Sequence, residues 1–328
     1  MKSKFDGYGA VIGRSRFLIL SANSYENLLT TINSNMEKFR EMLLLHGAIL
    51  LRGFDVTRDS FGAVVESLSG DRLDYIYRST PRTSVADRIY TATNYPADRE
   101  IPLHCEEAYQ RNWPMLLAFY CERPADEGGE TPLADMQKVT ASIGLELVQR
   151  FRRRGVCYIR NYIDGVDLPW TDVFQTESRV EVERFCAIHD IEFDWRRDGT
   201  LHTAHICQGT ALHPHSGDEV WFNQAHLFHV SSLGASIAQD MIETFGLKGL
   251  PRNAVYGDGG EIAVEDLQSI QNAFEQERVT FRWQKNDVLL LDNMQVAHGR
   301  LRYSGHRSIL VAMGGLRFSE SCHRDPRS

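Results

Sequence analysis

Two side chains near the middle of the chain have the types and spacing of metal ligands. His104 and Glu106 are separated by one residue in the segment 103–106, which alternates apolar and polar residues. On an extended strand this alternation would turn both side chains to one face and Glu107 to the other. An imidazole and a carboxylate placed in this way could bind the same metal ion.

The spacing of this pair is not distinctive by itself. His323 and Asp325 repeat it, and two pairs are about what chance gives for 12 His and 44 Asp plus Glu in 328 residues. The second pair lies in a polar C-terminal tail, where chain ends are usually loosely held. His104 and Glu106 are followed by an aromatic-rich segment and the Gly128-Gly129 turn. We therefore expect a metal site at the first pair.

A third ligand is available far downstream, at His298. It follows an apolar run, 288–291, that is typical of a buried strand, and Arg307 stands at the start of a second such run. Two histidines and one carboxylate from distant strands form the facial triad of non-haem Fe(II) oxygenases, which leaves metal positions open. The guanidinium of Arg307 would suit a dicarboxylate co-substrate, because it pairs with carboxylates through two parallel hydrogen bonds.

A series of motifs extends from about residue 40 to about residue 314. They are GAILLRGF at 47–54, YRSTPR at 77–82, TNYP at 93–96, IPLHCEEAY at 101–109, WP at 113–114, GGETPLAD at 128–135, RNY at 160–162, WFNQ at 221–224 and DNMQVAHGR at 292–300. In content and order these motifs resemble the taurine dioxygenase superfamily of Fe(II)- and 2-oxoglutarate-dependent oxygenases, and most closely its branch similar to the syringomycin biosynthesis hydroxylase.

This resemblance implies a role for each candidate residue. His104, Glu106 and His298 would be the ligands of Fe(II), and O2 would be one co-substrate. Arg307 would bind the distal carboxylate of the other co-substrate, 2-oxoglutarate, and the hydroxyl of Thr131 would contact the same molecule.

Three departures from taurine dioxygenase refine these expectations. Glu106 stands where taurine dioxygenase has aspartate, although clavaminate synthase resembles this chain in using glutamate. The spacing from His298 to Arg307 is shorter. Val311 occupies the place of the arginine that grips the taurine sulfonate, so a sulfonate substrate is not expected. A carboxylate ligand also favours hydroxylation, because related halogenases leave that position empty for chloride.

The branch resemblance implies an amino acid substrate in natural-product biosynthesis, either free or tethered to a peptidyl carrier protein. The expected reaction is hydroxylation of an unactivated C–H bond, with the β-carbon favoured and desaturation or cyclisation left open. The region 77–94 would border the substrate cavity, although a charged surface loop explains it equally well. The candidate substrate contacts are Arg78, Arg82, Asn94 and Asn223.

Two other classes of protein remain open. A zinc hydrolase could use two histidines and a glutamate with one open position, but it has no need of Arg307 or Thr131. A non-catalytic jelly-roll binding protein is the other alternative, and the intact ligand set argues against it.

The predicted fold is mainly β with flanking helices (α+β), built on a double-stranded β-helix, the cupin-like jelly roll. One domain is expected over 1–328, with an N-terminal α/β flank at about 1–75 and a possible lid insertion at about 161–175. Helices are expected at 24–46, 58–69, 136–154, 176–190, 235–245 and 264–277 from apolar periodicity and Gly stops.

Charge and hydropathy limit the classes of binding partner that the sequence allows. The net charge of −8 argues against nucleic acid, and no window approaches the ~20 apolar residues of a membrane span. The apolar run near the N-terminus is too short for a signal sequence, so a cytoplasmic protein is expected.

The six cysteines lack Cys-x-x-Cys spacing and are interpreted as reduced thiols. His213 and His215 flank Pro214 beside a turn and are not expected to bind metal, and the sequence leaves the oligomeric state open.

Overall fold

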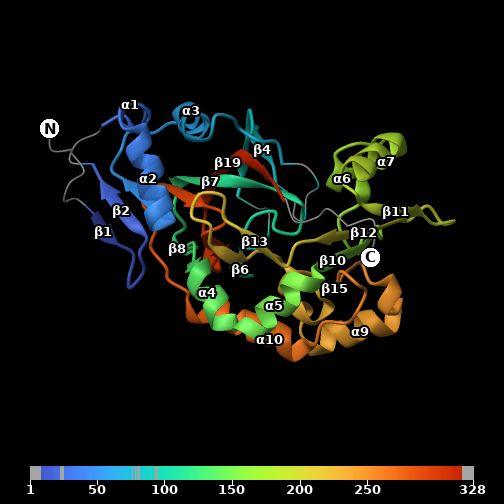
Figure 1. The fold of residues 1–328 in the computed structure, drawn as a ribbon. Helices are drawn as coiled ribbons and strands as arrows, with labels where there is room; N and C mark the ends of the chain where they lie inside the picture. The colour runs from blue at the N-terminus through green and yellow to red at the C-terminus, as the bar shows by residue number, and fades with distance from the viewer. Residues whose placement is uncertain are drawn as a thin grey trace.

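The largest element of the fold is an eight-stranded sheet. The computed structural model describes residues 9–22, 26–75, 77, 79, 82–92 and 95–319. The strand order of the large sheet is β1-β2-β3-β16-β7-β19-β5-β4, with β7 and β19 near its centre (Figure 1). Its strands are β1 (Gly9–Val11), β2 (Leu18–Ser21), β3 (Ala48–Arg52), β4 (Ser84–Ala86), β5 (Ile89–Thr91), β7 (Asn112–Arg123), β16 (Val288–Asp292) and β19 (Ser308–Phe318).

The central strand β7 contributes alternate residues to two hydrophobic cores. Successive side chains on a strand point to opposite faces of the sheet. The face that packs against the N-terminal helices carries Leu116, Ala118 and Tyr120. The opposite, inner face carries Leu117, Phe119 and Cys121. The neighbouring strands β16 and β19 divide their apolar residues between the same two cores, so the large sheet is buried on both sides.

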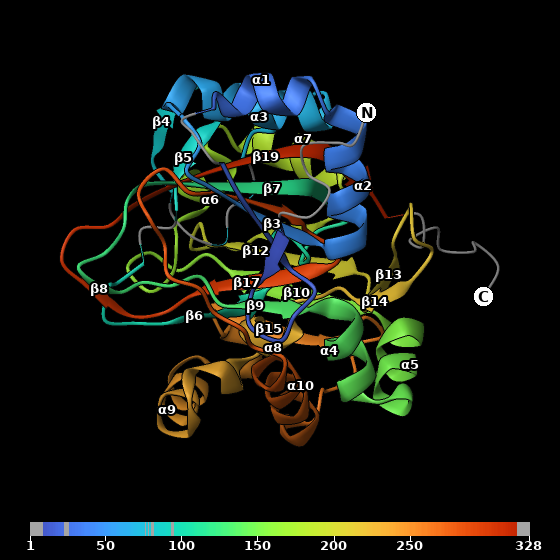
Figure 2. The same cartoon turned by 90° about the vertical axis from the view of Figure 1, so that its left-hand side faces the viewer.

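Three helices cover the first face: α1 (Leu28–Asn33), α2 (Met36–His46) and α3 (Arg58–Ser69), seen along one edge of the molecule in Figure 2. The expected continuous helix over 24–46 is wrong, because the chain turns at Ser34 and Asn35 between α1 and α2. The expected stop at Gly47 is confirmed. This residue has φ 71°, a conformation that is accessible to glycine without strain.

The N-terminal segment was expected to flank the sheet, and the structure instead places its strands within it. β3 pairs antiparallel with β16, and β2 pairs parallel with β3. The run 48–51 is fully buried because both of its faces are covered. A strand with two apolar faces needs neighbours on both sides, and the sheet supplies them.

The second layer consists of smaller sheets and the remaining helices. A three-stranded sheet, β6-β17-β9, faces the inner side of the large sheet, and a four-stranded sheet has the order β11-β12-β10-β15. The strands outside the large sheet are β6 (Ile101–His104), β8 (Glu127–Gly128), β9 (Leu133–Asp135), β10 (Val156–Asn161), β11 (Glu192–Trp195), β12 (Leu201–Cys207), β13 (Thr210–Leu212), β14 (Glu219–Trp221), β15 (Arg252–Tyr256), β17 (Val296–Arg300) and β18 (Tyr303–Ser304).

Helices α4, α5, α9 and α10 lie on the side of the molecule opposite α1–α3 (Figure 2). The expected helix over 136–154 is two helices, because Gly144 has φ 90° and interrupts it. None of the helices in the described ranges is long and apolar enough to cross a membrane. The remaining helices are α4 (Met136–Ile143), α5 (Leu145–Arg154), α6 (Trp170–Phe174), α7 (Arg179–Ile188), α8 (Ala225–Phe228), α9 (Ala235–Phe245) and α10 (Val264–Gln276), with the 3-10 turns η1 (Val230–Leu233) and η2 (Leu247–Gly249).

Candidate metal centre and its cavity

His104, Glu106 and His298 converge on one point between the two layers. His104 and His298 are directly opposite each other in the antiparallel pair β6 and β17, with ring centroids 4.5 Å apart. The Nε2 atoms of His298 and His104 lie 3.5 and 3.9 Å from Oε2 of Glu106. One donor atom from each residue lies within 4.8 Å of the others, which is close enough for all three to share an ion.

Glu106 reaches this point from a turn and not from a strand. β6 ends at His104, and Glu106 lies in the turn that follows. Glu107, the next residue, has φ 56°, a left-handed conformation that is uncommon outside glycine. The expected alternation along a strand is therefore wrong as the reason why His104 and Glu106 share a face. The bend of the chain after β6 brings them together.

Hydrogen bonding and burial prepare the imidazole of His104 for metal binding. Nδ1 of His104 donates to the carbonyl oxygen of Pro102 at 2.8 Å, which leaves the lone pair of Nε2 free to face an ion. Burial is the main cause that lowers the pKa of His104 to about 4, and the nearby His298 is the second. The imidazole is thus neutral near pH 7, the form in which histidine binds metals.

The carboxyl of Glu106 is held in its ionised form. Burial pushes its pKa upward, but the guanidinium of Arg82 and the two histidines outweigh burial and hold the pKa of Glu106 below its usual range. Nη2 of Arg82 donates to Oε2 at 2.8 Å, and both side chains are buried. Two imidazoles and one carboxylate are the donor set that suits Fe(II) with open coordination positions.

These side chains line part of the wall of a cavity of about 680 Å³, and we call this part the metal end. Thr131 and Arg307 belong to the wall of the same cavity. The hydroxyl oxygen of Thr131 accepts a hydrogen bond from Nε1 of Trp283 at 3.0 Å. Nε of Arg307 donates to the carbonyl oxygen of Gly129 at 3.1 Å, whereas its terminal nitrogens have no hydrogen-bond partner among the residues that the structure describes.

Arg307 remains a cation despite its surroundings. Burial is the main cause that lowers the pKa of Arg307 to about 10, and the nearby Arg300 is the second. This value is still above neutral pH. A partly buried cation whose terminal nitrogens lack an anion is suited to a carboxylate ligand. The residues present therefore fit a metal ion together with a dicarboxylate.

Another part of the wall, which we call the outer end, includes residues of connecting segments. Residues 166–168, within the predicted lid insertion, line it together with Arg252 at the start of β15. Asp167 accepts hydrogen bonds from Nε and Nη2 of Arg252, both at 2.5 Å, and Arg160 lies 3.5 Å away. Arg252 also donates to the carbonyl oxygen of Ser79 at 2.8 Å. Ion pairs between side chains thus join the insertion to the rest of the wall.

The four candidate substrate contacts have different outcomes. Arg82 lines the cavity, whereas Arg78 and Asn94 lie outside the described residues. Asn223 does not line the cavity, since its amide nitrogen donates to Gly209 O at 2.6 Å and its oxygen accepts from Ala225 N at 3.0 Å. That expectation is corrected: the neighbouring Gln224 lines the cavity instead.

Sequence reasoning missed several residues of the wall. Phe119 lines the cavity with its ring centroid 5.2 Å from that of His298, and the alternation along β7 contained the signal that could have found it. Arg252 carried no such signal, because its partner Asp167 is 85 residues away in the chain.

Other potential ligands are used differently. Nε2 of His213 pairs with Asp292 at 2.8 Å, and in the described ranges the group around His298 is the one set of His, Cys, Asp and Glu able to hold an ion. Five cysteines are buried free thiols, and Cys322 and the pair His323 and Asp325 lie outside the described residues.

Comparison with known proteins supports the geometry. Residues 21–313 match the family of taurine catabolism dioxygenase TauD and TfdA. The chain is 41% identical over 274 residues to the dapdiamide synthesis protein DdaC of Enterobacter agglomerans, covering 83% of each protein. It is 32% identical over 295 residues to a clavaminate synthase-like protein of Arabidopsis thaliana, covering 86% of each.

Two solved structures share the fold. AAD-2, in complex with Mn(II) and N-oxalylglycine, has a TM-score of 0.56 at 10% identity, covering 93% of this chain and 96% of that one. PvcB of Pseudomonas aeruginosa, an Fe, alpha-ketoglutarate dependent oxygenase from an isonitrile synthetic pathway, has a TM-score of 0.51 at 14% identity, covering 91% and 86%.

Fold and relatives together define an Fe(II)- and 2-oxoglutarate-dependent oxygenase with a jelly-roll core and flanking helices, which confirms the fold predicted from the sequence. The chain belongs to the TauD/TfdA family. Its cofactor is Fe(II), and its co-substrates are 2-oxoglutarate and O2.

Proposed function

We propose that this enzyme hydroxylates an unactivated C–H bond of an amino acid, at the β-carbon, in natural-product biosynthesis. The relative at 41% identity is named for the synthesis of dapdiamide, which supports a biosynthetic role. Desaturation or cyclisation would use the same cofactor and the same cavity, and remains the alternative outcome. We also propose that the chain forms a single oxygenase domain over 1–328, because β1–β3 hydrogen-bond into the same sheet as β7, β16 and β19.

In this proposal His104, Glu106 and His298 hold the iron. The observation that carries it is the convergence of their donor atoms within 4.8 Å at the metal end of the cavity. The hydrogen bond from His104 to Pro102 fixes which ring nitrogen faces the ion. The buried carboxylate of Glu106 supplies the negative charge, which lowers the cost of placing a divalent cation in a desolvated site.

Arg307 and Thr131 would bind the distal carboxylate of 2-oxoglutarate. The guanidinium of Arg307 can donate two parallel hydrogen bonds, and the hydroxyl of Thr131 can donate one while its oxygen accepts from Trp283. When bound, Fe(II) and 2-oxoglutarate supply the oxidising chemistry with O2, and the products of the co-substrate are succinate and CO2. The chain itself positions these groups and excludes water with apolar wall residues such as Phe119 and Ile101.

The substrate would bind between the metal end and the outer end of the cavity. About 680 Å³ falls within the usual range for small-molecule sites and exceeds what a free amino acid fills. Arg82 is our proposed contact to the substrate carboxylate, because it is a cation in the wall beside Glu106. An amino acid presented by a peptidyl carrier protein would enter through the outer end.

An anaerobic titration with Fe(II) and 2-oxoglutarate tests the ligand set. The wild-type protein should develop the metal-to-ligand charge-transfer absorption of a chelated 2-oxo acid, and the His298→Ala variant should not. Equal bands in both proteins would show that His298 is not a ligand.

Substrate class is tested by succinate release in the presence of O2. A panel of free amino acids and the same amino acids loaded on a peptidyl carrier protein should stimulate release above the level without substrate. Mass spectrometry of the stimulating compound should show a gain of one oxygen. A loss of two hydrogens without oxygen would favour the alternative outcome.

A further inference from the structure

The side chain of Asn293 pairs with both backbone groups of Glu106. Its oxygen accepts from Glu106 N at 2.8 Å, and its nitrogen donates to Glu106 O at 2.9 Å and to Pro114 O at 2.8 Å. Asn293 is fully buried. The side-chain amide thus replaces the partner strand that Glu106 lacks, because β6 ends two residues earlier.

This arrangement distinguishes Glu106 from the two histidines. His104 and His298 are held opposite each other by the strand pairing of β6 with β17. Glu106 lies beyond that pairing. Its carboxylate is placed by the backbone conformation of a turn, and the contacts of that backbone are the ones to Asn293.

Asn293 belongs to a turn that is stabilised by its neighbour, Asp292. Oδ1 of Asp292 accepts from the backbone nitrogens of Met294 at 3.0 Å and Gln295 at 3.2 Å, which closes the turn between β16 and β17. His298 follows three residues after Gln295, in β17. One turn therefore holds the backbone of one proposed ligand and leads directly into another.

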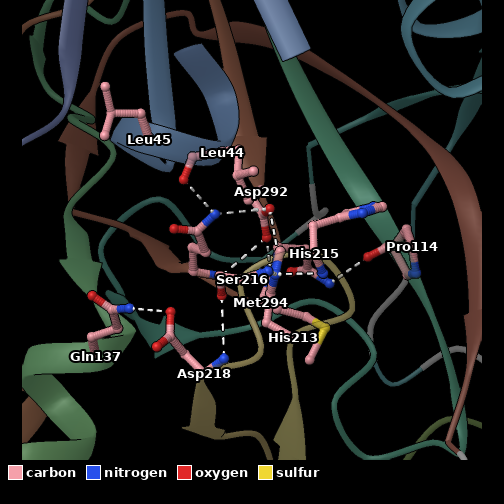
Figure 3. A network of polar contacts seen from close by, with 12 residues as sticks. Leu44, Leu45, Pro114, Gln137, His213, His215, Ser216, Asp218, Asp292 and Met294 are labelled. Carbon is pink, nitrogen blue, oxygen red and sulfur yellow. Dashed lines mark hydrogen bonds and ion pairs between the residues drawn. The ribbon is translucent and has the colours of Figure 1, made fainter. Parts of the chain in front are cut away.

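A buried histidine fixes Asp292 from the other side. Nδ1 of His213 accepts from the backbone nitrogens of His215 at 3.3 Å and Ser216 at 3.0 Å. The proton of the neutral ring is therefore on Nε2, which donates to Oδ2 of Asp292 at 2.8 Å. Figure 3 shows His213 and Asp292 facing each other within this network.

Gln295 completes the surroundings of Asp292. Its amide nitrogen donates to Oδ2 of Asp292 and to Leu44 O, both at 3.1 Å. Both carboxylate oxygens of Asp292 are thus occupied, and the turn is tied to the loop after β13 and to helix α2. Such a fully bonded buried network holds its members in one geometry.

We propose that Asn293 is a positioning residue of the metal centre, and that the His213–Asp292 pair holds the turn that carries it. This inference rests on the ligand set proposed above. It assigns to Asn293 the orientation of the Glu106 backbone, and to His213 a supporting role behind the site. Groups that orient metal ligands typically change metal affinity by about 10–100-fold when removed.

The test measures Mn(II) binding by electron paramagnetic resonance, with no substrate or O2 needed. Asn293→Ala should weaken Mn(II) binding by about 10–100-fold. The matched control is Asn161→Ala, because Asn161 is equally buried and its amide also donates to two backbone carbonyls, those of Lys248 and Leu250. Its hydrogen bonds in the described residues include none to a proposed ligand. The control should bind Mn(II) with wild-type affinity.

A second pair of variants keeps the test valid if Asn293→Ala does not fold. His213→Leu removes the donor to Asp292, whereas His213→Gln retains an amide N–H that can replace it. His213→Leu should weaken Mn(II) binding several-fold, and His213→Gln should restore it. Circular dichroism confirms that each compared variant is folded.

The outcomes separate this inference from the ligand assignment. If His298→Ala loses Mn(II) binding while Asn293→Ala and His213→Leu bind as tightly as the wild type, the positioning role is refuted and the ligand set stands. If His298→Ala also binds Mn(II) normally, the ligand set itself is wrong. If Asn161→Ala weakens binding as much as Asn293→Ala, the loss reflects general destabilisation and the positioning role is refuted.

Discussion

The two ends of the cavity are built in different ways. The metal end contains two imidazoles on paired strands, one carboxylate from a turn and the cation Arg307. At the outer end, residues from connecting segments meet through the ion pair of Asp167 and Arg252. Strand pairing holds the two histidines of the metal end, the side chain of Asn293 holds the backbone of Glu106, and an ion pair between side chains holds the outer end. We infer that the metal end supplies the groups that hold the metal ion and that the outer end influences which substrate enters.

The largest expected difference between the ends is in metal affinity. His104→Ala removes a donor atom and should weaken Mn(II) binding by more than about 100-fold, beyond the range for groups that only support ligands. Asp167→Asn should leave the affinity unchanged, because Asp167 belongs to the outer end. Isothermal titration with Mn(II) measures both. Comparable losses in the two variants would contradict the division of the cavity.

The next largest effect concerns the co-substrate. Arg307→Gln removes charge-assisted hydrogen bonds worth roughly 1.5–3 kcal/mol, which corresponds to about a 10–100-fold loss in 2-oxoglutarate affinity. Metal affinity should not change. Anaerobic absorbance titration with 2-oxoglutarate measures the loss, and Arg307→Lys, which keeps the charge but not the fork geometry, should lose less. An unchanged affinity in Arg307→Gln would remove the proposed role.

A smaller effect is expected in the stability of the outer end. Asp167→Asn leaves Arg252 and the buried Arg160 facing a neutral amide, which should destabilise the segment 161–175 locally by about 1–3 kcal/mol. Limited proteolysis should then cleave this segment faster, with little change elsewhere, because local openings depend on local contacts. Cleavage at the wild-type rate would show that the ion pair does not hold the outer wall.

The smallest effect is the acid sensitivity of the same pair. Burial raises the pKa of Asp167, but Arg252 and Arg160 outweigh burial and hold it below the usual value of 3.8. A carboxyl whose pKa is depressed by folding stabilises the protein above its unfolded pKa, and this stabilisation is lost as pH falls through the folded pKa. Cleavage of 161–175 should therefore be constant from pH 8 to pH 5 and increase below about pH 4. Asp167→Asn should lack this dependence, and an increase already between pH 7 and pH 5 would contradict it.

The convergence of the three proposed metal ligands could be predicted from the sequence. Histidine and glutamate are residue types that bind metal ions, and the motifs around His104, Glu106 and His298 resemble those of a known family. The local reason for their convergence was not predictable. The alternation at 103–106 indicates a strand, but the chain turns after His104. The backbone groups of Glu106 in that turn bond to Asn293, almost 190 residues away. Sequence periodicity contains no information about such a partner.

The outer end of the cavity and the breaks between helices were harder to predict from the sequence, for related reasons. Asp167 and Arg252 are ordinary charged residues until folding brings them together. Asn223 and Gln224 are chemically similar neighbours, and the backbone conformation after β14 decides which one faces the cavity. Gly144 interrupts a pattern whose apolar stripe continues on both sides, since Val139, Ile143, Leu147 and Phe151 are all buried. Periodicity detects the stripe and not the break.

Strand β7 gives the enzyme two independently adjustable surfaces within one segment. Phe119 faces the reaction cavity and the ring of His298, whereas its neighbour Tyr120 faces away and donates from its hydroxyl to Val56 O. An exchange at position 119 would reshape the space offered to a substrate while the helical cover stays bonded through position 120. A substitution at position 119 can therefore change the cavity without disturbing the packing contacts made by its neighbour at position 120.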